Sequence, residues 1–201
     1  MKRVYVCGDS FCVPDPEYGS CWVDLLSQQR TVTNLAQVSA TNILISLQVE
    51  QAIQEHADFV IVQGTSCTRG QKRHQGQLQP FSYHTASEVT TPFDSRTLQL
   101  IKEYYTDIFD LGLEIYQNRC IIENTLQKLV DSGIPFLFDQ GGFEHPKFGA
   151  VNTNYFSKYD RYRSLINLWD YTVTRNYRPY YHITDPAIHQ EVANYYLEAT
   201  Q

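Results

Sequence analysis

The sequence predicts a single α/β domain built on a mainly parallel sheet. Short runs of β-branched and aromatic residues alternate with stretches of helical periodicity, and such alternation is typical of a parallel sheet with helices on both faces. The chain of 201 residues is long enough for one sizeable core, and its 42% hydrophobic and 19% charged residues are ordinary for a folded protein. Residues 1–201 are therefore expected to form one domain.

The first 63 residues carry this alternation. Strands are predicted at Arg3–Cys7, Thr31–Leu35 and Asp58–Gln63, which are rich in β-branched and aromatic residues. Amphipathic helices are predicted between them at Cys21–Gln29 and Thr41–His56. Because the carboxyl ends of parallel strands meet at one edge of a sheet, residues 8–10, 36–41 and 64–68 are expected to lie together there.

The remainder of the chain is less regular. Residues 69–95 are rich in Gln, His, Thr, Ser and Pro and lack periodicity, so they are predicted to form an irregular insertion, which could cover the site. Residues 96–131 return to helical spacing, with Gly112 as a candidate bend. Further elements are predicted as a strand at Ile134–Phe138, a helix at Tyr162–Trp169, and a helix at Ile188–Leu197 with Thr184 as N-cap and Pro186 in its first turn.

Net charge, apolar stretches and cysteine spacing argue against nucleic acid, membranes and metals as partners of this protein. A net charge of −6 disfavours nucleic acid and anionic membranes, and the basic cluster at 69–74 is short enough to be a solvated loop. The N-terminal apolar stretch is too short for a signal peptide, and no apolar run has the length of a membrane span. Five irregularly spaced cysteines, including Cys7 and Cys12, favour a reduced cytoplasmic protein without a metal or other cofactor.

The tripeptide Gly8-Asp9-Ser10 directly follows the first predicted strand. A serine at such a turn can be exposed at the edge of the sheet, with backbone N–H groups beside it that can bind an oxyanion. A serine hydroxyl becomes a nucleophile when a base takes its proton. The alternative is a tight turn that is merely capped by the side chains of Asp9 and Ser10.

This tripeptide resembles the first sequence block of the SGNH (GDSL-like) hydrolases, and three later segments resemble the other blocks. Residues 34–42 are similar to the second block, with Ser39 in place of the glycine whose N–H helps to form the oxyanion hole. Gly64-Thr65-Ser66-Cys67 is similar to the third block, with Ser66 in place of the oxyanion-binding asparagine. Thr65 and Arg69 are further candidates to assist there, or the loop hydroxyls simply satisfy backbone groups.

The last block, near the C-terminus, supplies the histidine base in this family. His182 is the preferred match, because it precedes a capped helix and a loop position lets it reach Ser10. His189 is the alternative base. Pro179 stands where the family has its aspartate, so the group that orients the imidazole is open. The candidates are Asp185, whose ordinary role would be to cap the helix, Asp170, Asp139 or a backbone carbonyl.

The resemblance implies a three-layer α/β/α sandwich with a mainly parallel, flavodoxin-like sheet of five strands. It also implies a serine hydrolase that cleaves an acyl ester of a sugar, lipid or other small molecule, without a cofactor. Small divergent members with a helical insertion and Thr-Ser in the third block are associated with phage and bacterial genomes.

Two other functions remain open. The first is a weakly active or inactive SGNH-like fold that binds carbohydrate or protein, because the Tyr-rich stretches 152–162 and 171–181 could stack on sugar rings. The second is a flavodoxin-like nucleotide binder, which the absence of a Gly-rich phosphate loop disfavours.

Overall fold

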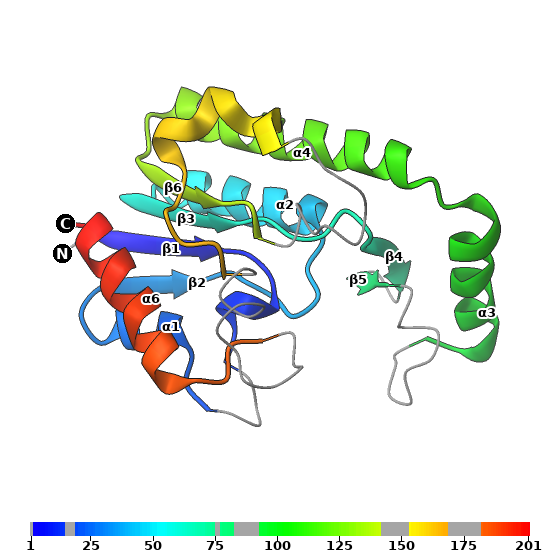
Figure 1. The fold of residues 1–201 in the computed structure, drawn as a ribbon, viewed down its shortest axis with the longest axis horizontal. Coiled ribbons are helices and arrows are strands. Elements are labelled where there is room, and N and C mark those ends of the chain that lie inside the picture. Colours follow the sequence, from blue (N-terminus) through cyan, green and yellow to red (C-terminus); the bar gives the residue numbers. More distant parts are fainter. Residues whose placement is uncertain (1, 15–18, 75–76, 83–92, 142–152, 169–181) are drawn as a thin grey trace.

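The computed structural model describes residues 2–14, 19–74, 77–82, 93–141, 153–168 and 182–201. In this part of the chain, one parallel sheet lies between two layers of helices (Figure 1). The predicted three-layer α/β/α class with a mainly parallel sheet is therefore confirmed.

The central sheet has the strand order β2-β1-β3-β6, and every pairing in it is parallel. Its strands are β1 (Arg3–Cys7), β2 (Thr31–Asn34), β3 (Phe59–Gln63) and β6 (Phe136–Asp139). Five strands were expected, and the described residues form four. Beyond β6, a single parallel bridge joins Phe138 to Arg163, on the side of the sheet where a fifth strand would pair.

Helices cover both faces of this sheet. They are α1 (Trp22–Ser27), α2 (Asn42–Gln54), α4 (Leu111–Ser132) and α6 (Pro186–Ala199). On one face, Val49 of α2 and Leu126 of α4 are fully buried in one hydrophobic cluster. On the other face, Trp22 of α1 packs on Tyr196 of α6 with ring centroids 4.7 Å apart. Two cores on opposite faces of one sheet keep its carboxyl edge accessible for a site.

The N-cap of the C-terminal helix lies one residue later than predicted. Thr184 was expected to cap this helix, but the N-cap is Asp185, whose carboxylate accepts a hydrogen bond from the N–H of Ala187 at 2.8 Å. Pro186 follows in the first turn, as predicted. A carboxylate accepts from orphan amides of the first turn and also interacts favourably with the helix dipole, which explains its preference for this position.

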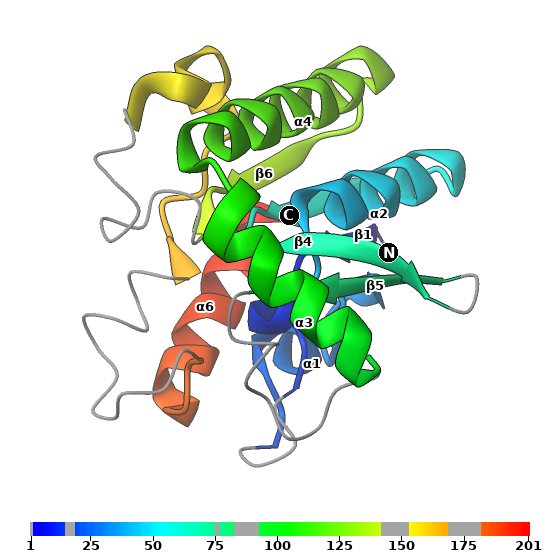
Figure 2. The same ribbon diagram turned by 90° about the vertical axis from the view of Figure 1, so that its right-hand side faces the viewer.

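The insertion contains regular structure that the sequence pattern did not reveal. β4 (Gly70–His74) and β5 (Gln77–Phe81) form an antiparallel hairpin within the segment that was predicted to be irregular. Helix α3 (Ser95–Glu103) runs alongside the hairpin (Figures 1 and 2). The prediction was wrong for β4 and β5 because most of their residues are polar, so no apolar alternation marks them as strands.

The helical segment predicted at 96–131 is interrupted. After α3, the π-helix η3 (Tyr104–Ile108) is followed by Phe109, whose backbone is extended. Asp110 then caps α4 by accepting from the N–H of Leu113 at 2.8 Å. The break therefore lies before Gly112, the predicted bend. An apolar periodicity that continues through a break cannot reveal it, whereas a capping aspartate can.

The helix predicted at Tyr162–Trp169 is not present at residues 163–167. Instead, the 3-10 helix η6 (Thr153–Tyr162) ends at Tyr162. The next residue, Arg163, forms the bridge to Phe138, and the N–H of Ser164 donates to the Phe138 carbonyl at 2.8 Å. Pairing with the edge of the sheet therefore replaces helical hydrogen bonding at this point.

Candidate active site

Ser10 lies at the first turn after the central strand β1. It begins a short 3-10 helix, η1 (Ser10–Cys12), and Asp9 is its N-cap, with the carboxylate accepting from the N–H of Phe11 at 3.0 Å. Because β1 lies inside the sheet, this turn is flanked by the loops that follow the neighbouring strands β2 and β3. The turn therefore lies where open parallel sheets usually bind their ligands.

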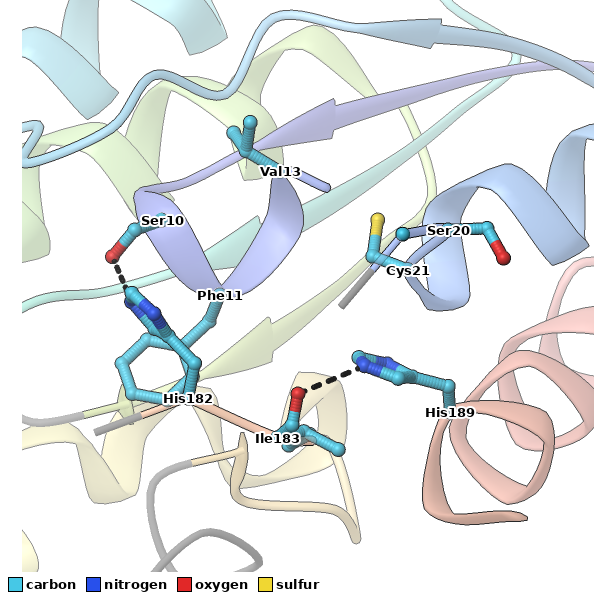
Figure 3. Close-up of a pocket in the computed structure, with 9 residues that line it drawn as sticks. Ser10, Phe11, Val13, Ser20, Cys21, His182, Ile183 and His189 are labelled. Carbon is cyan, nitrogen blue, oxygen red and sulfur yellow. Dashed lines mark hydrogen bonds between the residues drawn. The ribbon is translucent and has the colours of Figure 1, made fainter. Parts of the chain in front are cut away.

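His182 lies beside Ser10, although 172 positions separate the two residues in the sequence. Its Nε2 is 2.9 Å from the Ser10 Oγ, and both side chains line one pocket (Figure 3). The imidazole also packs edge-on against Phe11, with ring centroids 5.4 Å apart. A hydroxyl and an imidazole at this distance have the geometry that proton transfer from serine requires.

His189 lies in the same pocket but is bound to other groups. Its Nε2 is 3.0 Å from the Ile183 carbonyl, and its Nδ1 accepts from the N–H of Trp22 at 3.2 Å (Figure 3). Accepting that N–H requires an unprotonated Nδ1, so the proton is assigned to Nε2. The structure thus brings His182, and not His189, to Ser10.

We expect His189 to make stability depend on pH. Burial lowers the pKa of its imidazole below the ordinary 6.5, so the unfolded chain takes up the proton first as the pH falls. The stabilising contribution is complete above about pH 6.5 and is lost as the pH decreases towards the lower folded-state value. Urea unfolding at pH 7 and pH 5 will measure this decrease in the free energy of unfolding. The decrease will be smaller in His189→Asn, because asparagine keeps an acceptor but does not titrate. Equal losses in both proteins would contradict this role of His189.

Two buried glutamines hold the backbone of the nucleophile turn. The Oε1 of Gln48 accepts from the N–H of Gly8 at 2.7 Å, and the Oε1 of Gln63 accepts from the N–H of Asp9 at 3.2 Å. A side chain at Gly8 would collide with this arrangement, because a Cβ there would lie 2.8 Å from the Cys12 sulfur. Neither glutamine was predicted from the sequence, where the one available signal was a polar residue among apolar neighbours.

Ser39 takes a backbone conformation that glycine favours. Its φ is +61°, and it lies in a turn closed by the hydrogen bond from the Ala40 N–H to the Gln37 carbonyl at 3.1 Å. The Gln37 N–H in turn donates to the Gly8 carbonyl at 3.2 Å, which joins this turn to that of Ser10. A non-glycine residue in this region costs about 1 kcal/mol. Ser39 thus fits the backbone, at some strain, where the resemblance places a glycine.

The loop after β3 is held mainly through Thr65. The side-chain amide of Asn42 accepts from the Thr65 N–H and donates to its carbonyl, both at 3.0 Å, and donates to the Asn118 side chain at 2.8 Å. The Gly64 N–H donates to the Asp139 carbonyl at 2.8 Å. Asn42, in α2, thus fixes the backbone of the loop, and Asn118, in α4, holds Asn42 in place. Neither role was predicted from the sequence.

The remaining predicted groups of this loop make local contacts. The Ser66 hydroxyl lies 2.8 Å from the Thr68 hydroxyl and accepts from the Thr68 N–H at 3.2 Å, as in a loop-closing turn. The Thr65 hydroxyl donates to the Asp9 carboxylate at 2.6 Å, and the guanidinium of Arg69 donates to the same oxygen at 2.7 Å. Thr65 and Arg69 therefore contact the residue next to Ser10.

Two of the candidate acids have structural partners. Asp185 caps α6, and Asp139 is 2% exposed and accepts from the N–H groups of Gly141 at 2.8 Å and Leu168 at 3.0 Å. Asp170 lies outside the described residues. The orienting group for His182 therefore stays a prediction.

Four of the five cysteines are packed inside the protein, and Cys120 is exposed. Cys7, Cys12, Cys21 and Cys67 are buried free thiols, and burial raises the pKa of the Cys21 and Cys67 thiols to about 11. In the part of the chain that the structure describes, no group of three side chains is arranged to hold a metal ion.

In the stretch 152–162, Tyr159 is 4% exposed, and Tyr162 stacks on Phe136 with ring centroids 4.2 Å apart. These two rings are not presented for stacking on a sugar. Residues 171–181 lie outside the described residues.

Comparison with known proteins relates the fold to esterases. No family model and no curated protein sequence matches the chain. The acetyl xylan esterase AlAXEase superimposes with a TM-score of 0.59 at 15% identity, over 98% of each chain. The psychrotrophic esterase EstA from Pseudoalteromonas sp. superimposes with a TM-score of 0.56 at 9% identity, over 100% of this chain and 96% of that chain. The chain shares the fold of these esterases. No helix in the described ranges has the length and hydropathy needed to cross a bilayer.

Proposed function

We propose that the protein is an SGNH-like serine hydrolase that cleaves carboxylic esters, with Ser10 as nucleophile and His182 as general base. The observation that supports this most strongly is the 2.9 Å distance between the Ser10 Oγ and the His182 Nε2 at the carboxyl edge of the sheet. The fold shared with two esterases agrees with this chemistry.

In the proposed reaction, the Ser10 oxygen attacks the ester carbonyl carbon while His182 takes the hydroxyl proton. The backbone N–H groups of Ser10 and Ser39, together with the Ser66 hydroxyl, are the proposed donors to the oxyanion. Collapse of the tetrahedral intermediate breaks the bond to the alcohol oxygen, which receives the proton from His182. Water then attacks the acyl-serine with the same base, so that ester and water become acid and alcohol.

The proposed substrate is a small-molecule, sugar or lipid ester. One of the structures that share the fold is an acetyl xylan esterase, and another, EstA, was solved in a form inhibited by monoethylphosphonate. A short acyl group is therefore the first substrate to test, and a phosphonate is the first covalent probe.

We expect the purified protein to hydrolyse p-nitrophenyl acetate and Ser10→Ala to lose this activity. The loss should be at least ~10³-fold, because the proposed covalent step has no other nucleophile. Ser27→Ala is the matched control, since Ser27 is exposed on α1 and its hydroxyl donates to the Asp24 carbonyl of its own helix. Release of nitrophenol is measured together with thermal unfolding of each variant.

The alternative function gives a different result in the same assay. An inactive fold that binds carbohydrate or protein would be folded but would hydrolyse the ester no faster than Ser10→Ala. That outcome would reject the hydrolase proposal.

A further inference from the structure

Arg69 connects the three loops that surround Ser10. Its Nη1 donates to the Asp9 carboxylate at 2.7 Å and to the Ala40 carbonyl at 3.2 Å. Asp9 follows β1, Ala40 lies between β2 and α2, and Arg69 itself follows β3. Because these strands are neighbours in the order β2-β1-β3, one guanidinium links the loops at three adjacent strand ends.

Asp9 connects Arg69 to the backbone on either side of Ser10. Its side chain is 1% exposed, and one carboxylate oxygen accepts from the N–H of Phe11, while the other accepts from Arg69 and Thr65. A carboxylate this buried is costly unless it is paired and hydrogen-bonded. Ser10 lies between Asp9, whose carboxylate accepts the hydrogen bond, and Phe11, whose N–H donates it. Fixing the Asp9 side chain therefore fixes the backbone on both sides of the proposed nucleophile.

The π-helix η3 and the strand β4 hold the chain on either side of Arg69. The hydroxyl of Tyr105, in η3, donates to the Thr68 carbonyl at 2.6 Å. The Gln71 side chain, in β4, accepts from the Thr41 hydroxyl at 2.7 Å. Figure 1 shows that the hairpin and α3 extend away from the central sheet, so these contacts join that extension to the loops of the site. The hairpin and the π-helix thus act as a support for the guanidinium.

We propose that Arg69 is a positioning residue for the reaction at Ser10, acting through Asp9 and not by direct contact with the substrate. This inference rests on the proposed function. Displacement of a reacting group by about 1 Å can cost ~100-fold in rate. Loss of the guanidinium therefore slows the chemical step at Ser10 and leaves substrate binding nearly unchanged.

The test is a double-mutant cycle of Asp9→Asn and Arg69→Met, with Arg69→Lys as the conservative variant. Asp9→Asn keeps the acceptor for the Phe11 N–H and leaves no unpaired carboxylate, so it serves even where Arg69→Met unfolds. Arg96→Met is the matched control, because Arg96 is exposed on α3. For each folded variant, we measure the rate of labelling by a fluorophosphonate, kcat and KM for p-nitrophenyl acetate, and the unfolding midpoint.

We expect each single substitution to lower kcat and the labelling rate by ~30-fold or more, with KM within about twofold of the wild-type value. The double variant should be no slower than the slower single variant, because both substitutions remove the same link. Arg69→Lys should recover part of the rate, since an ammonium reaches one of the two acceptors.

Three outcomes would overturn the inference. If only Arg69→Met is slow and Asp9→Asn reacts at the wild-type rate, Arg69 acts directly on the oxyanion or substrate. If the unfolding midpoints fall while the folded variants react at the wild-type rate, the ion pair is merely structural. If the wild-type protein is neither labelled nor active, the proposed function fails and this role fails with it, whereas in the first two cases the proposed function stands.

Discussion

His182→Asn is expected to lower kcat/KM for ester hydrolysis by about 10³-fold or more while the protein stays folded. An asparagine amide cannot take the proton from the Ser10 hydroxyl, so the nucleophile loses its base. The 2.9 Å contact between the two side chains makes His182 the histidine on which this effect is expected. Turnover of p-nitrophenyl acetate and the unfolding midpoint are measured on the same preparation.

Two further histidines serve as comparisons for this substitution. His56→Asn changes the same residue type at an exposed position of positive φ, which asparagine tolerates, and should leave the activity at the wild-type level. His189→Asn should lose far less activity than His182→Asn, because the ring of His189 is bound to Trp22 and Ile183. If His189→Asn alone loses most of the esterase activity, His189 is the general base and the assignment of His182 is wrong.

Gly141→Ala is expected to destabilise the fold by about 3 kcal/mol or more. The φ of Gly141 is +56°, and a Cβ there would lie 2.1 Å from the Gly64 carbonyl oxygen and 2.5 Å from the Gln63 amide nitrogen. The first of these contacts is with backbone, so the collision displaces the loop after β3 itself. Because Gln63 also binds the N–H of Asp9, the displacement extends to the turn of Ser10. Urea unfolding measures the loss.

Gly133→Ala separates backbone strain from steric collision in this prediction. Gly133 ends α4 with a φ of +71°, and a Cβ there meets nothing within 4 Å. Alanine at this position is destabilised only by the left-handed backbone conformation, by about 1 kcal/mol. Equal destabilisation by Gly141→Ala and Gly133→Ala would show that the collision with the Gly64 carbonyl contributes nothing to the loss of stability.

The architecture was predictable because the buried strands have a simple signature. The runs at Arg3–Cys7 and Asp58–Gln63 are apolar and β-branched, and the structure places β1 and β3 within one residue of them. The hairpin β4–β5 escaped prediction because its strands are mostly polar. The predicted helix after Tyr162 failed because pairing of Arg163 with the edge of β6 replaced local helical hydrogen bonds.

The structure brings together two predicted residues at element boundaries, Ser10 and His182, whereas the buried polar residues that support their loops were not predicted. Ser10 follows a strand, so topology predicted it at the carboxyl edge of the sheet. His182 was predicted there from the resemblance of its segment to the last SGNH block and from its position before a capped helix. Gln48, Gln63 and Asn118 support the loops from inside helices and strands. The sequence does not reveal these contacts, because the partners lie 40 or more positions away: the backbone N–H groups of Gly8 and Asp9 for the glutamines and the Asn42 side chain for Asn118.

The most direct test of the proposed Ser10–His182 chemistry is to map the covalent adduct that a fluorophosphonate forms with the folded protein. Peptide mass spectrometry after labelling should find the phosphonyl group on Ser10, at one group per chain. Labelling should disappear in Ser10→Ala and slow strongly in His182→Asn. An adduct on another side chain, or an unlabelled Ser10 in the folded wild-type protein, would contradict the proposal.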